Sequence, residues 1–316
     1  MLKYLIVQLD DSAPSFCHYT LKDKDQRLIP LDLLEKALIW AMKENLNVQF
    51  IYPESELPTE YKKIIDFVDH ADIASVCCED NSLVRKAEVL LLSSLSIPEK
   101  LELRKGCAYV WRTTISDFLI NYKVMIEILP HIDRINVVFT DVINFKDSMK
   151  AAYSAALDRL AQAIVSEYKH QHQVQLNLLT DRMLLNEMNN CNAGDESITL
   201  CPDGKFYVCP AFYSDEENAV GDLNSGPFIM NEELLKLSYA PICRICDAWQ
   251  CRRCVWMNRE LTHEVNTPGH EQCLMAHIER NASARLARRL RNECDIKLGK
   301  DFTETECLDP FERLNN

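Results

Sequence analysis

Eight cysteines between residues 191 and 273 constrain this chain more than any other feature of its sequence. Two Cys-x2-Cys pairs each let one tight turn present two thiolates to a metal, and more distant cysteines complete sets of four. Eight thiols are the number that two four-thiolate sites require, so we expect two inorganic centres in this region. The eight are Cys191, Cys201, Cys209, Cys243, Cys246, Cys251, Cys254 and Cys273.

The spacing alone does not decide which metal these sites hold. Two structural zinc ions and two [4Fe-4S] clusters both use four thiolates per site with a similar reach. His263 and His270 lie close enough in the sequence to replace a thiolate. A place in a surface loop explains them more simply, so they are second-choice ligands.

The remaining composition limits the cellular setting. The first residues, MLKYLIVQLDD, lack the cleavage site of a signal peptide, and no later stretch reaches the ~18 apolar residues of a membrane span. We therefore expect a cytoplasmic protein without a membrane partner. In that reducing compartment, 14 cysteines indicate metal binding rather than a disulfide framework.

The charge distribution argues against a nucleic-acid partner. The net charge is −13, whereas phosphate binding needs a concentrated basic face. One segment is an exception, because residues 280 to 291 (RNASARLARRLR) carry five arginines with apolar residues at helical spacing. This segment is either a solvated helix packed on the cysteine-rich region or a binding surface for an acidic peptide.

The first 180 residues alternate short β-branched runs with helical patterns. Such a β/α rhythm predicts a parallel sheet with helical crossovers. A partial (β/α)6 barrel fits better than a Rossmann fold, because no glycine-rich phosphate loop follows any strand. Expected strands cover residues 4–8, 48–52, 73–77, 89–92, 108–111, 135–139 and 174–178, and expected helices cover residues 31–44, from about 60, 115–129 and 147–168.

Residues just after these strands would line the mouth of a barrel, which is the end where active sites lie. Most of them are acidic, which fits either a charged functional cleft or simple capping of the helices that follow. They are Asp10, Asp11, Glu54, Glu56, Cys77, Cys78, Glu79, Asp80, Arg112, Asp141, Asp181 and Arg182.

The cysteine pattern resembles the SPASM domain of radical SAM peptide-modifying enzymes. It runs Cys-x12-Gly-x4-Cys, a gap, Cys-x2-Cys-x4-Cys-x2-Cys, a gap, and a final Cys. The usual family run is Cys-x2-Cys-x5-Cys-x3-Cys, so two gaps are one residue shorter here. The resemblance implies two [4Fe-4S] clusters, one held by Cys191, Cys201, Cys209 and Cys254 and the other by Cys243, Cys246, Cys251 and Cys273. Gly204 would then form the turn of a hairpin between Cys201 and Cys209.

A SPASM domain usually follows a radical SAM barrel, but two parts of the S-adenosylmethionine site are missing from this sequence. The loop after the first strand has only Cys17 in place of Cys-x3-Cys-x2-Cys, and the second strand ends Tyr-Pro-Glu-Ser-Glu instead of Gly-Gly-Glu. We therefore expect no S-adenosylmethionine site. Cys17, Cys77 and Cys78 could form an unusual cluster site at the mouth, or could be buried as small apolar side chains.

The start MLKYLIVQLDD, the Ser-Phe-Cys-His-Tyr loop and the stretch IYPESELP look like the bacterial family of CXXX repeat peptide maturases. That resemblance covers nearly the whole chain. It implies a role in maturing a ribosomally made peptide with a cysteine at every fourth position, beside a true radical SAM partner enzyme. No catalytic residue follows from it.

Three functions therefore stay open. The first is an iron–sulfur redox or scaffold component of peptide maturation, or the maturase itself. The second is a non-enzymatic, zinc-dependent peptide-binding or assembly protein, and the third is an active radical SAM enzyme with unusual cluster ligands. The expected domains are a degenerate radical SAM-like partial barrel at 1–185, a SPASM domain at 186–280, and a C-terminal helix and tail at 281–316.

Overall fold

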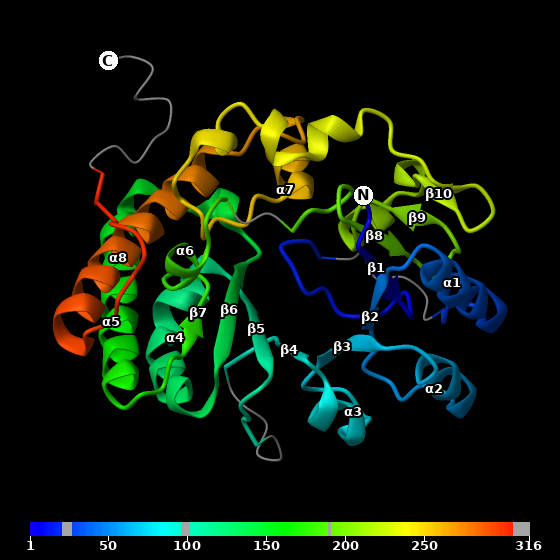
Figure 1. The fold of residues 1–316 in the computed structure, drawn as a ribbon, viewed down its shortest axis with the longest axis horizontal. Helices are drawn as coiled ribbons and strands as arrows, with labels where there is room; N and C mark the ends of the chain where they lie inside the picture. Colours follow the sequence, from blue (N-terminus) through cyan, green and yellow to red (C-terminus); the bar gives the residue numbers. More distant parts are fainter. Residues whose placement is uncertain (21–26, 96–101, 189–190, 306–316) are drawn as a thin grey trace. The chain divides into compact units, whose positions relative to one another are not determined.

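The computed structural model describes residues 1–20, 27–95, 102–188 and 191–305. The chain divides into two compact units, each built from two separate stretches of sequence. The first unit combines Met1–Leu92 with Cys191–Tyr239, and the second combines Ser93–Asn190 with Ala240–Asn316. Both are α/β structures whose parallel strands are connected through helices (Figure 1).

The sheet of the first unit has the strand order β4-β3-β2-β1-β8-β9. All neighbours are parallel except β8 and β9, which form an antiparallel hairpin. Near the centre of this sheet is β1, where Leu5 and Val7 are fully buried. The elements are β1 (Tyr4–Gln8), α1 (Leu31–Lys43), β2 (Asn47–Ile51), α2 (Thr59–Ile65), β3 (His70–Ser75), α3 (Asn81–Lys86), β4 (Val89–Leu92), β8 (Ser197–Leu200), β9 (Phe206–Tyr207), and the two-stranded pair β10 (Gly221–Asp222) and β11 (Gly226–Pro227).

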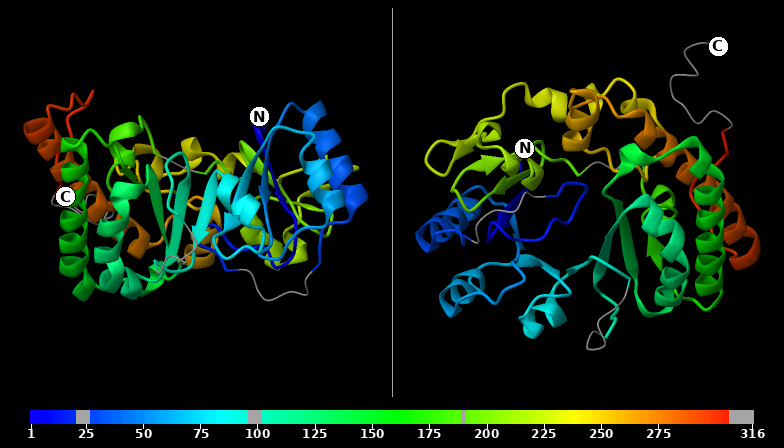
Figure 2. Two further views of the ribbon diagram at one scale, coloured as in Figure 1. Left: turned by 90° about the horizontal axis from the view of Figure 1, so that it is seen from below. Right: turned by 180° about the vertical axis from the view of Figure 1, so that it is seen from behind.

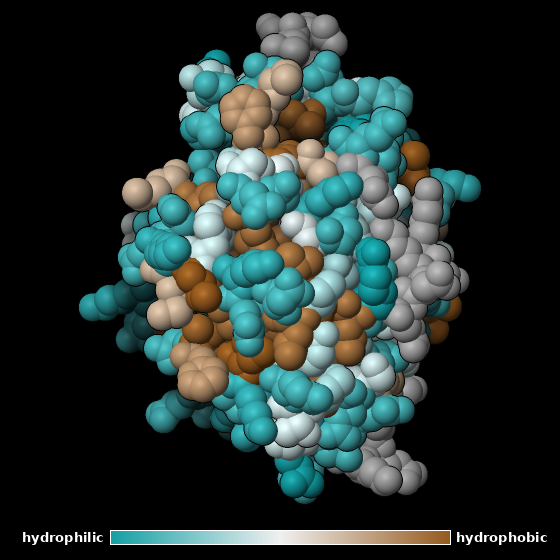
Figure 3. Space-filling model, turned by 90° about the vertical axis from the view of Figure 1, so that its right-hand side faces the viewer, coloured by the Kyte–Doolittle hydropathy of each residue, from teal (hydrophilic) through white to brown (hydrophobic). Residues whose placement is uncertain are grey.

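Helix α1 illustrates how the sequence pattern positions an element. Its buried side chains Leu34, Ala37, Leu38 and Ala41 recur at three- and four-residue spacing and form one apolar face. The opposite face leaves Met42 exposed. On the side of the molecule where α1 lies, apolar side chains gather near the centre of the face and are interrupted by hydrophilic ones (Figure 3).

The second unit has a three-stranded parallel sheet of order β5-β6-β7. Two long helices, α5 and α8, lie side by side in every ribbon view (Figures 1 and 2). Tyr153 of α5 donates a hydrogen bond to Glu279 of α8 at 2.6 Å between oxygens, and both side chains are buried. The elements are β5 (Ala108–Thr113), α4 (Ile115–Ile128), β6 (Arg134–Phe139), α5 (Lys150–Lys169), β7 (Gln175–Leu176), α6 (Asp181–Leu184), α7 (Val255–Thr262) and α8 (His270–Cys294).

The strands and helices predicted in the first 180 residues occur in the predicted order, and α3 is an additional helix between β3 and β4. The other differences are in extent. The strand expected at 174–178 is cut to β7, because the backbone N–H groups of Leu179 and Thr180 turn back to the carbonyl of Leu176. The basic helix expected at 280–291 is the second half of α8, which crosses the boundary expected at residue 280. The three-domain division itself stays a prediction.

The arginines of α8 are neutralised within the chain. Arg285 pairs with Asp158 and Glu304, and Arg288 also reaches Glu304. Arg280, Arg289 and Arg291 have carboxylate partners too. The solvated, packed helix is therefore the better description of this segment. None of the helices in the described residues is long and apolar enough to cross a membrane.

The predicted hairpin between Cys201 and Cys209 is present. Gly204 lies in its turn with φ +79°, and its N–H donates to the carbonyl of Cys201. An added Cβ at Gly204 would lie 2.9 Å from the Leu33 side chain. The turn therefore needs glycine both for its left-handed backbone and for its close approach to α1.

We expect Gly204→Ala to lower the free energy of unfolding by about 2 kcal/mol, because it adds left-handed strain and a contact with Leu33. Gly106 has φ +75° but an open space around it, so Gly106→Ala should cost only about 1 kcal/mol. Urea unfolding measures both variants. Equal losses would show that the Leu33 contact adds nothing.

Candidate metal centres

Four of the eight predicted cysteines come together in the second unit. Cys243, Cys246, Cys251 and Cys273 line one small, mostly apolar cavity. Cys243 and Cys246 belong to the turn before α7, Cys251 follows in the next loop, and Cys273 lies in the first turn of α8. These four are the set that the SPASM resemblance assigns to the second centre.

The four thiols influence one another's ionisation. Burial, and then the neighbouring Cys243 and Cys273, raise the pKa of Cys251 well above its ordinary value. Burial is also the main reason why the pKa of Cys243 rises to about 11. Without a metal, Cys243 and Cys251 therefore hold their protons at neutral pH, and a metal that binds here must displace them.

Arginine and histidine side chains lie around the same cavity. Arg253 is only 1% exposed and lines the cavity, and His277 lines it at 5% exposure. The buried Arg182 and Arg280 flank Cys246 by sharing Asp247, with N–O distances of 2.6 Å and 3.0 Å. Buried guanidinium groups need nearby negative charge. A metal centre held by four thiolates would supply it.

Three nitrogen atoms lie against the sulfurs. His277 Nε2 is 3.5 Å from Cys246 Sγ, and the backbone N–H of Ala248 donates to the same sulfur at 3.4 Å. The Gln272 amide donates to Cys251 Sγ at 3.9 Å. Donors of this kind stabilise thiolates and tune iron–sulfur clusters. The donor set and its surroundings therefore fit a four-thiolate centre.

The other predicted set is divided between the units. Cys201 follows β8 and Cys209 follows β9, so the Gly204 hairpin presents both. Burial, then Cys191, then Cys17 raise the pKa of Cys209, which shows that these thiols are neighbours. Cys254 belongs to the second unit, where it caps α7 and its sulfur accepts a hydrogen bond from the N–H of Met257. That Cys254 binds the same centre as the other three cysteines of this set stays a prediction.

The cysteines expected at the barrel mouth have different surroundings. Cys17 lies near Cys209, while Cys77 is exposed and the Cys78 thiol donates to the carbonyl of Pro53. In the part of the chain that the structure describes, no three Cys, His, Asp or Glu side chains converge on a point that could hold a single metal ion.

The histidine nearest the thiols is not one of the two second-choice ligands. His263 ends α7 in a left-handed conformation, His270 begins α8, and neither lines the cysteine cavity. His277 does line it. A signal for His277 was available in the sequence, because it follows Cys273 by four residues and so shares a helix face with it.

The acidic residues after the strands mostly have structural partners. Asp80 caps α3, and Asp141 accepts a hydrogen bond from the first N–H of α4. Asp11 is held by Arg27 and Tyr213, and Asp181 pairs with Arg134. Helix capping and ion pairing therefore explain these acids, which favours the simpler alternative over a charged functional cleft.

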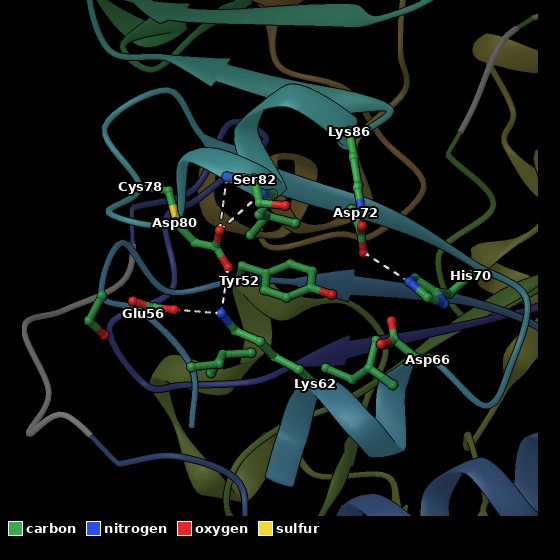
Figure 4. A pocket seen from close by; sticks show the side chains of 14 residues that line it. Tyr52, Glu56, Lys62, Asp66, His70, Asp72, Cys78, Asp80, Ser82 and Lys86 are labelled. Atoms are coloured by element: carbon green, nitrogen blue, oxygen red, sulfur yellow. Dashed lines mark hydrogen bonds and ion pairs between the residues drawn. The ribbon is translucent and has the colours of Figure 1, made fainter. Parts of the chain in front are cut away.

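A separate cleft of about 330 Å³ lies between α2 and α3 in the first unit (Figure 4). Some of its charges are paired, because Lys62 lies 2.7 Å from both Glu56 and Asp80. Asp72 lies 3.4 Å from His70, and burial raises the pKa of Asp72. Cys78 lines this cleft and none of the eight predicted metal ligands does, so the cleft stands apart from the predicted metal centres.

Comparison with known proteins gives the fold. No family model and no curated protein matches the sequence. The structure of a tagged form of anSMEcpe with bound AdoMet, an anaerobic sulfatase-maturating radical SAM enzyme, aligns at TM-score 0.62 and 15% identity. The alignment covers 92% of this chain and 96% of that one. This chain shares the fold of that enzyme over nearly its whole length.

Two related structures agree with that result. Native anSMEcpe with bound AdoMet and Cp18Cys peptide aligns at TM-score 0.59 and 14% identity, covering 92% of this chain and 100% of that one. The same enzyme with Kp18Cys peptide aligns at TM-score 0.60 and 15% identity, again covering 92% of this chain and 100% of that one. The predicted partial barrel followed by a cysteine-rich region is thus confirmed as the fold class.

The buried Glu279 should make stability depend on pH. Burial raises its pKa from 4.5 to about 7. The folded state therefore favours the protonated acid over the carboxylate by roughly 3 kcal/mol more than the unfolded state does. That contribution is complete below pH 4.5 and is lost as the pH rises through 7. Glu279→Gln mimics the protonated acid and should remove the loss.

Chemical unfolding at about pH 5 and about pH 8, on either side of the raised pKa, measures this effect. We expect Glu279→Gln to be more stable than the wild type at the higher pH, with a much smaller difference at the lower one. Glu304→Gln, which alters an ion-pair partner of the same helix, is the control. An identical pH dependence in wild type and Glu279→Gln would rule out a raised pKa.

Proposed function

We propose that this protein is a SPASM-type iron–sulfur protein that takes part in maturing a ribosomally made peptide. The observation that carries the proposal is the cavity lined by Cys243, Cys246, Cys251 and Cys273 within a radical SAM fold. The second cluster would use Cys191, Cys201, Cys209 and Cys254. With all four positions of each cluster taken by thiolates, the clusters would transfer electrons or stabilise the structure.

Iron–sulfur clusters are favoured over zinc by the arrangement of the thiols. A tetrahedral zinc site brings four sulfurs within about 3.8 Å of one another, given Zn–S bonds of about 2.3 Å. Here the sulfurs surround a cavity, and no group among the described residues converges on one ion. Buried arginines around the cavity suit the negative charge of either centre and do not separate the two.

A peptide substrate is supported by the comparison and by the CXXX resemblance. Two of the anSMEcpe structures hold a peptide, Cp18Cys in one and Kp18Cys in the other, and the fold is shared over 92% of this chain. We infer that the substrate is a Cys-x-x-x repeat peptide. A radical SAM partner enzyme in the same cytoplasmic compartment would complete the system.

We further propose that this chain does not itself cleave S-adenosylmethionine. In the radical SAM reaction three protein thiolates hold a cluster that has one open iron. The loop after β1 contributes Cys17 alone, and its Asp11 is engaged with Arg27 and Tyr213. This loop therefore has a structural role, and it offers a cluster only one thiol.

Anaerobically prepared protein should contain about eight irons per chain and little zinc. Cys251→Ser should lower the iron content by about half, because it removes a ligand of one cluster. Cys77→Ser, which changes an exposed cysteine, should leave it unchanged. Elemental analysis decides, and two zinc ions per chain would instead support the zinc-dependent assembly protein.

Incubation of the reduced protein with S-adenosylmethionine should yield no 5′-deoxyadenosine, while a Cys-x-x-x repeat peptide should bind. Liquid chromatography detects the nucleoside, and calorimetry measures peptide binding against the same peptide with serine at each cysteine. Production of 5′-deoxyadenosine would instead favour an active radical SAM enzyme. No affinity for the repeat peptide would contradict its assignment as substrate.

A further inference from the structure

We infer that Arg253 and His277 are positioning residues for the proposed cluster. They stabilise the negative charge of this centre and so raise its reduction potential. Its ligands are Cys243, Cys246, Cys251 and Cys273. This inference rests on the proposed iron–sulfur function and adds how the protein sets the properties of one cluster. Neither residue is a predicted ligand.

Arg253 is the first part of the argument. It is among the largest fully buried side chains of the protein, at 1% exposure, and it lines the cysteine cavity. Arg253 lines this cavity together with all four cysteines, so its guanidinium charge would act on any centre that they bind. A nearby cation stabilises an anionic centre built from four thiolates.

His277 is the second part. It is 5% exposed and lies one helical turn after Cys273 on α8, with Nε2 at 3.5 Å from Cys246 Sγ. A thiolate bound to iron has no proton to donate, so this contact is a hydrogen bond when Nε2 carries the hydrogen. The imidazole then withdraws electron density from the sulfur.

The side chains near these sulfurs differ in where they lie. Arg182 and Arg280 both bind Asp247, which lies next to Cys246 and offsets part of their charge. Arg253 and His277 face the cavity itself. They are therefore the side chains on which the electrostatics of the centre should depend most directly.

The consequence concerns one-electron reduction. The cluster takes up one electron from the reductant used in the titration, no covalent bond breaks, and its negative charge increases by one. In a buried, low-dielectric site a nearby positive charge and a hydrogen-bond donor stabilise the reduced form more than the oxidised form. Removing either side chain should therefore make the midpoint potential more negative.

The test is a dithionite titration of full-length, anaerobically reconstituted protein followed by electron paramagnetic resonance. The transition that belongs to this centre is the one lost in Cys251→Ser. We compare Arg253→Met and His277→Leu with the charge-preserving Arg253→Lys. Arg288→Met, which removes an exposed charge from α8, is the control.

We expect the assigned midpoint potential to shift in the negative direction in Arg253→Met and His277→Leu, to return towards the wild type in Arg253→Lys, and to stay constant in Arg288→Met. If Arg253→Met fails to take up iron while Arg253→Lys does, the need for a cation at this position is shown directly, and His277→Leu still reports on the potential.

Full iron loading with unchanged potentials in both Arg253→Met and His277→Leu would overturn the inference and leave the proposed function standing. Failure of every variant and of the wild type to bind iron would instead refute the proposed function, and the inference with it. The two failures are therefore distinguishable in one set of samples.

Discussion

The proposed metal centre of the second unit depends on four thiols that line one cavity. Burial raises the pKa values of Cys243, Cys246 and Cys251. The arrangement favours protons in the absence of metal and metal in its presence, because the same four sulfurs can bind one or the other. Under the proposed function, binding of an inorganic centre would be coupled to folding around these thiols.

Charge organises the surroundings of this cavity. The chain has a net charge of −13, yet the side chains nearest the cysteine cavity include buried arginines and His277. Buried cations are costly unless an anion compensates for them. Asp247 compensates for Arg182 and Arg280, and a thiolate-bound centre would add negative charge beside Arg253. The acidic residues are used elsewhere, largely as helix caps and ion-pair partners.

Much of the fold could be predicted from local patterns, and so could part of the candidate site. β1 and β4 are continuous apolar runs, and α1 has a regular apolar face, so periodicity located all three. β7 was predicted too long, because the hydrogen bonds of Leu179 and Thr180 that end it depend on tertiary geometry. Cysteine spacing predicted eight ligands, and the SPASM resemblance supplied the set of four that lines the cavity. Three-dimensional proximity was beyond prediction: Cys17 lies near Cys209, and Arg253 does not stand out until its burial is known.

Anomalous diffraction at the iron edge from crystals grown without oxygen would test the central claim most directly. The account predicts a strong iron signal enclosed by the sulfurs of Cys243, Cys246, Cys251 and Cys273. A signal that appears only at the zinc edge, or an iron signal located away from these four sulfurs, would contradict it.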